Sequence, residues 1–106
     1  MLCREAIALN PTDAVAHSSL GTSLVRTGHT EDGAREIATA IGLDDKEPSV
    51  LWDAGLVAVL RNRNAEALDW LRKAVKAGYC REIIARQPEF GALRDSADFQ
   101  ALVGTR

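Results

Sequence analysis

Apolar residues recur along this chain three or four positions apart, the spacing that places them on one side of an α-helix. One such stripe consists of Val15, Leu20, Leu24 and Val25. The next consists of Ile37, Ala40 and Ile41. Abundant alanine and a total of three prolines also favour helix over strand. The pattern therefore predicts long helices at residues 13–27, 30–42, 48–61 and 64–77.

Short polar breaks at 27–30 and 61–64 divide these helices into pairs. Gly28 and Asn62 stand within the breaks and tolerate the left-handed backbone that ends many helices. Thr30 and Asn64 follow them and carry side chains suited to capping the next helix. Pro48 is suited to the first turn of the third helix. Each pair is therefore expected to form a helical hairpin.

The chain repeats itself with a period of 34 residues. Segment 6–9 aligns with 40–43 and 74–77, and Gly21 aligns with Gly55. Glycine inside a helix costs about 1 kcal/mol relative to alanine, so these two glycines need a packing reason. We expect Gly21 to contact Gly33 and Gly55 to contact Ala67. Because Ala67 already carries a methyl group, the alignment suggests that Gly33→Ala would be tolerated.

The period and its small residues resemble the tetratricopeptide repeat family. The residues that carry the resemblance are Leu20-Gly21, Ala40, Ala54-Gly55, Ala67, Ala74 and the linker Leu9-Asn10-Pro11. The chain departs from the family pattern at His17 and Leu51, where the family favours tryptophan. The resemblance implies an all-α fold of antiparallel helix–turn–helix repeats, stacked as a short right-handed α-solenoid with a C-terminal helical cap. It divides the chain into the tail of a truncated repeat (1–13), two repeats (14–47 and 48–81) and capping helices (82–106).

Residues 79–103 break the period and are expected to cover the last repeat, whose apolar face would otherwise meet water. Trp70 is expected to be part of what they cover. Pro88 should separate two short helices, and Asp95 or Ser96 should cap the last. The expected covering residues are Ile83, Ile84, Phe90, Leu93, Phe99 and Leu102.

Composition and charge narrow the class of function. The 106 residues are 46% hydrophobic, enough for the core of one domain. The net charge of −2 does not suggest a nucleic-acid partner. The charge is unevenly spread, at −5 over residues 10–60 and +4 over 61–86, which indicates either solvated helix faces or an electrostatic seam that orients a partner.

No segment is long and apolar enough to suggest a membrane partner. Cys3 and Cys80 lack metal-site spacing and are expected to be free thiols in a reducing, cytoplasmic setting.

Catalytic motifs are absent from the sequence. His17 and His29 are the only histidines, and a structural role is expected for each. No metal-ligand spacing, nucleophile elbow or glycine-rich phosphate loop occurs. The sequence therefore predicts a protein that is not an enzyme and holds no cofactor or metal.

What remains is a surface for a protein or peptide partner, and a second copy of the chain is one possible occupant. In proteins of this family the first helices of successive repeats line a concave groove. The groove candidates are Ser18, Thr22, Val25, Arg26, Ser49, Trp52, Asp53, Leu56 and Val59. We expect Trp52 to anchor the partner, with packing against another part of the parent protein as the competing interpretation. The leading hypothesis is an interaction scaffold. The alternative is a regulatory or structural C-terminal appendage of a larger signalling enzyme of the cyclase or kinase type.

Overall fold

The computed structural model describes residues 13–104, and every regular element within that range is helical. Four long helices come first: α1 (Asp13–Arg26), α2 (Thr30–Leu43), α3 (Pro48–Leu60) and α4 (Asn64–Lys76). Three short ones follow: α5 (Arg81–Arg86), the 3₁₀ helix η1 (Pro88–Leu93) and α6 (Ala97–Val103). The long helices end within one residue of their predicted limits, and the all-α class is confirmed. The expected repeat tail before α1 lies outside the described residues.

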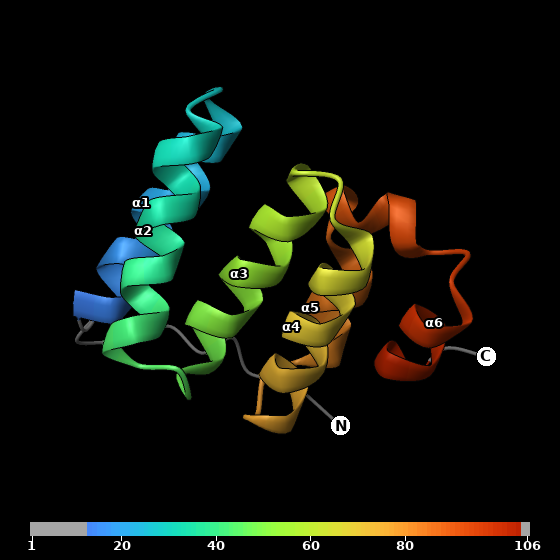
Figure 1. Cartoon of the computed structure of the whole chain (residues 1–106). Helices are drawn as coiled ribbons and strands as arrows, with labels where there is room; N and C mark the ends of the chain where they lie inside the picture. Colours follow the sequence, from blue (N-terminus) through green and yellow to red (C-terminus); the bar gives the residue numbers. More distant parts are fainter. Residues whose placement is uncertain (1–12, 105–106) are drawn as a thin grey trace.

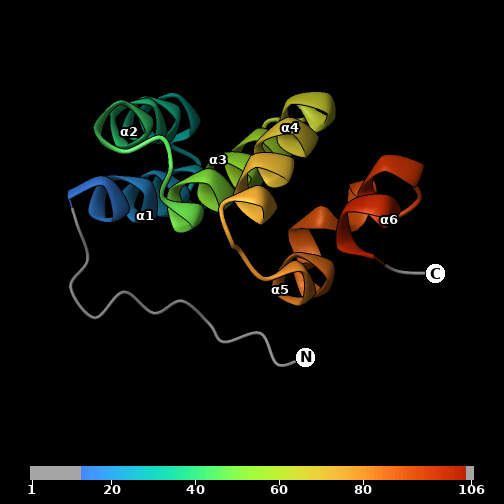
Figure 2. The same cartoon turned by 90° about the horizontal axis from the view of Figure 1, so that it is seen from below.

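The long helices form two hairpins that lie side by side (Figures 1 and 2). Helix α1 packs on α2, and α3 packs on α4. Helix α3 occupies the middle of the molecule because it also contacts α1, α2 and η1. Its sequence is apolar on all sides, which is typical of a helix surrounded by other elements.

The turns use the residues that the sequence indicated, but the helix caps differ from the prediction. Gly28 and Asn62 have positive φ values of 93° and 61°, so each ends a long helix in the left-handed region. Thr30 and Asn64 are already the first residues of α2 and α4. The cap positions fall on His29 and Arg63, neither of which makes a side-chain cap hydrogen bond.

The two helices of the first hairpin are in backbone contact. A Cβ atom on Gly21 would lie 2.8 Å from the carbonyl oxygen of Gly33, and one on Gly33 would lie 2.6 Å from the carbonyl oxygen of Gly21. A Cβ on Gly33 would come closer still to the Val25 side chain. The predicted Gly21–Gly33 contact is confirmed, but no space exists for a methyl group at Gly33. The suggestion that Gly33→Ala would be tolerated is therefore wrong.

The second hairpin is less tightly closed. A Cβ on Gly55 would meet the Leu71 side chain at 2.8 Å and the carbonyl oxygen of Ala67 at 3.5 Å. Gly55 therefore faces Leu71 first and Ala67 second. The wider spacing explains why alanine fits at position 67 while its equivalent, Gly33, must be glycine.

The C-terminal segment covers α3 and α4 as expected, and its main contributors are fully buried: Ile84, Phe90, Leu93 and Phe99. Ile83 and Leu102 are half-buried. Pro88 opens η1 after α5 has ended, and the Ser96 hydroxyl accepts a hydrogen bond from the backbone N–H of Phe99 at 3.3 Å. The predicted break at Pro88 and the predicted cap at Ser96 are both confirmed.

Leu20 does not belong to the core, contrary to the predicted stripe. Its side chain is 48% exposed. The buried side of α1 is formed by Ala14, Ser18, Gly21, Thr22 and Val25. Position 20 lies off that side because successive helical residues are rotated by about 100°.

Candidate functional site

The structure brings the predicted groove residues together where α1 runs beside α3, but their surface is closed. Arg26 is exposed, and Ser49 and Trp52 are half-buried. The remaining six are buried: Ser18, Thr22, Val25, Asp53, Leu56 and Val59. These six side chains are not open to a partner in this structure, and their role in partner binding stays a prediction.

The α3 part of this surface is covered by the chain's own C-terminal segment, whereas Val25 of α1 packs with residues of α2 and α3. Helix η1 lies against α3, and Phe90 from η1 is fully buried there in one cluster with Leu56 and Val59. The sequence indicated that residues 82–106 would cover the end of the array. It did not indicate that they would also cover the first-helix surface.

Trp52 packs against the C-terminal segment as well. Its indole stacks on Tyr79 and meets the ring of Phe90 edge-on, with centroids 6.1 Å apart. The indole Nε1 is buried and has no hydrogen-bond partner among the described residues. A buried, unpaired N–H is a cost that the aromatic contacts must offset. The competing interpretation, in which Trp52 packs against another part of the protein, fits this arrangement.

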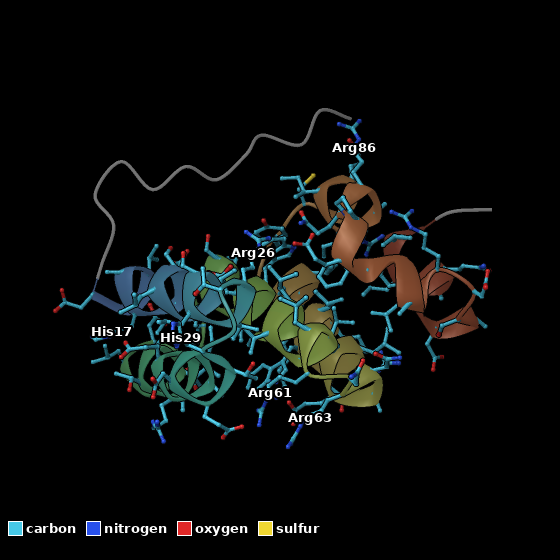
Figure 3. The ribbon with its side chains drawn as sticks, turned by 90° about the horizontal axis from the view of Figure 1, so that it is seen from above. His17, Arg26, His29, Arg61, Arg63 and Arg86 are labelled. Carbon is cyan, nitrogen blue, oxygen red and sulfur yellow. The ribbon has the colours of Figure 1, made fainter. Side chains whose placement is uncertain are left out.

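An ion pair connects the first hairpin to the C-terminal segment. Arg26, at the end of α1, donates to the Glu89 carboxylate of η1 at 2.8 Å. Figure 3 shows Arg26 on the side of α1 that faces the C-terminal helices. Burial acts to raise the pKa of Glu89, but hydrogen bonds, chiefly from Gln87, and the charge of Arg26 hold that pKa below its usual value. The pair is largely solvated, so it fixes the position of η1 more than it stabilises the fold.

Beneath this ion pair lies a buried carboxylate. Asp53 on α3 faces Ser18 and Thr22 on α1, and burial raises its pKa to about 6 although both hydroxyls and Arg26 act to lower it. The hydroxyls of Ser18 and Thr22 also lie 3.1 Å from the carbonyl oxygens of Val15 and Ser18. Each hydroxyl has one hydrogen, so it can donate either to its own helix or to Asp53. Ionised Asp53 draws these hydrogens toward itself.

The histidines lie away from this cluster. His17 Nδ1 is 2.6 Å from Glu36 Oε1 and joins α1 to α2, whereas His29 lies exposed in the turn (Figure 3). Within residues 13–104, no group of three or more His, Cys, Asp or Glu side chains could hold a metal ion. Over the same range, no helix is long and apolar enough to cross a membrane.

Cys80 is buried and joined in a disulfide bond, so the expectation of two free thiols is wrong. Cys3 lies outside the described residues.

No protein-family model, curated protein or solved structure matches the chain.

Proposed function

We propose that this chain is a non-catalytic scaffold for protein interaction, built from tetratricopeptide-type repeats that belong to a right-handed α-solenoid. The observation that carries the proposal is the recurrence of one construction. Helices α2 and α4 begin 34 residues apart, at Thr30 and Asn64, and each packs on its partner through small residues one period apart. Repeats of this kind stack in series and form an extended surface for binding partners.

The partner's surface is not the one between α1 and α3. Leu56 and Val59 of that surface pack with Phe90 of η1, and Trp52 packs on Tyr79 and Phe90. A partner that bound there would have to displace the C-terminal segment and expose its apolar residues to water. We therefore place the partner on the outer surfaces of the hairpins.

The chemistry of the described residues supports a binding role more than a catalytic one. The groups that act on the buried Asp53 are the hydroxyls of Ser18 and Thr22 and the charge of Arg26. The His17–Glu36 pair spans two helices of one hairpin, as a structural contact does.

The disulfide at Cys80 removes the support for a reducing, cytoplasmic compartment, because such compartments rarely maintain disulfides.

Site-specific photocrosslinking tests the proposal in cells that produce the protein. A photoreactive residue would replace one exposed position at a time: Ser19, Ser23, Thr39, Arg72 or Lys73. The scaffold proposal expects crosslinks to one protein from neighbouring positions on one surface. Crosslinks to another domain of the same polypeptide would favour the enzyme-appendage alternative. An absence of crosslinks at every position would contradict a scaffold.

A further inference from the structure

Two adjoining depressions lie beside the loop that connects the hairpins. Their volumes are about 340 and 400 Å³, and they share Asp45, Lys46 and Lys73 in their linings. The first also reaches Leu51 and Lys76, and the second reaches Ile41 and Trp70. Together they form one pocket, with apolar residues from three helices and lysines from the loop and from α4.

The pocket is held in shape by contacts within the chain. The Asp44 side chain accepts a hydrogen bond from the backbone N–H of Lys46 at 3.0 Å, which orders the loop. On α4, the ammonium group of Lys73 lies 4.6 Å from the centroid of the Trp70 ring. This cation–π contact holds a positive charge beside an apolar surface.

The lining of the pocket carries more positive than negative charge, although Asp44 and Glu47 also lie on the loop beside Asp45 and Lys46. Lys46, Lys73 and Lys76 form no ion pair within residues 13–104, and the lining holds a single carboxylate, that of Asp45. Arg26, Arg35, Arg61 and Arg72 form ion pairs, whereas Arg63, Arg81, Arg86 and Arg94 form none within residues 13–104. The dipole of α4 favours lysines in its last turn, which accounts for Lys73 and Lys76. It does not account for Lys46, which joins them from the loop.

We propose that this pocket binds an acidic peptide segment of the protein partner. One apolar side chain of the segment would lie on Trp70 and Ile41, which line the same depression and are half-buried, and its flanking carboxylates would pair with the three lysines. Apolar contact and charge complementarity would act together, since neither is strong alone on an exposed surface. The inference rests on the proposed function and adds the chemistry of the partner.

The test is an NMR titration of the intact ¹⁵N-labelled chain with a blocked peptide of glutamates and aspartates around a central leucine. The chain has two tryptophans, so Trp52 provides an internal reference for Trp70. We expect a saturable shift of the Trp70 indole N–H and of backbone amides at 44–46 and 70–77, while the Trp52 indole stays unchanged. Peptides with glutamine and asparagine for the acids, or alanine for the leucine, should bind at least several-fold more weakly.

The matched variants remove equal charge from different places. Replacing Lys46, Lys73 and Lys76 with glutamine should weaken binding by about tenfold or more. Replacing Arg63, Arg81 and Arg86 with glutamine removes the same charge elsewhere and should leave binding within about twofold. Equal weakening by both triple variants, or no shift at Trp70, would overturn the proposal. The scaffold function would survive that outcome if photocrosslinking still identified a partner on another surface.

Discussion

The indole of Trp52 stacks on the ring of Tyr79, with the centroids 5.6 Å apart and the planes inclined by 19°. Tyr79 lies in the connection between α4 and α5, and Phe90 of η1 adds an edge contact. Trp52 thus joins the second hairpin to the segment that follows it. Trp52, the aromatic residue of the expected groove, therefore contributes to the packing of the fold.

Truncating Trp52 should therefore destabilise the protein. We expect Trp52→Ala to cost about 3 kcal/mol of unfolding free energy, because it removes two aromatic contacts and opens a void beside Phe90. Leu20→Ala should cost less than about 1 kcal/mol, because Leu20 is half exposed. Urea unfolding of both variants checks this ranking. A larger loss for Leu20→Ala would mean that the faces of α1 and α3 are wrongly assigned.

Alanine substitution of the two glycines in α2, Gly33 and Gly42, should change stability in opposite directions. Gly33→Ala should cost about 1–3 kcal/mol, because its Cβ would press on the backbone of Gly21 and on Val25. Gly42→Ala has open space around its Cβ and should stabilise the helix by up to about 1 kcal/mol. Thermal or urea melts of the pair provide the measurement. Equal stability of the two variants would show that α1 and α2 are not in backbone contact.

The buried Asp53 should make stability depend on pH. Its pKa in the folded protein is about 6, against an ordinary value of 3.8, so the folded state holds the proton more tightly than the unfolded state. This group's contribution therefore falls as the pH rises from about 4 through 6, by about 2–3 kcal/mol at most. Asp53→Asn should remove that fall and make the protein more stable than the parent at pH 8.

Urea melts at pH 5 and pH 8 measure the effect. If the parent and Asp53→Asn lost stability equally between pH 5 and pH 8, Asp53 would not be the source of the pH dependence.

The helix caps give a fourth comparison. Ser96→Ala should cost about 1 kcal/mol, because the Ser96 hydroxyl accepts a hydrogen bond at the start of α6. Asn64→Ala should change stability by less than about 0.5 kcal/mol, because Asn64 makes no cap hydrogen bond and lies exposed on α4. A larger effect at Asn64 than at Ser96, measured by urea unfolding, would contradict this assignment.

The helices and turns could be predicted because their causes are local. Gly28, Asn62, Pro48 and Pro88 act on the backbone within one or two residues, and the apolar period is set within each helix. The Gly21–Gly33 contact could be predicted as well, because the repeat drew attention to both residues. Its closeness could not, since the distance between α1 and α2 depends on every side chain between them.

The candidate site was harder to predict because burial depends on which elements meet. Leu20 and Ala54 are equivalent in the repeat, yet Leu20 is half exposed and Ala54 is buried beneath α2. The apolar character of α3 indicated that something covers it, but not that η1 does so. The pairing of Arg26 with Glu89 joins residues 63 positions apart and leaves no local pattern.

The central claim is that the C-terminal segment covers α3 at Trp52, Leu56 and Val59, and proton–proton NOEs in the intact chain test it most directly. We predict cross-peaks from the Trp52 indole to the ring protons of both Tyr79 and Phe90, together with slow hydrogen exchange of the buried Trp52 indole N–H. Absence of the Phe90 cross-peaks, with an indole N–H that exchanges as fast as free tryptophan, would contradict the account and reopen that surface to a partner.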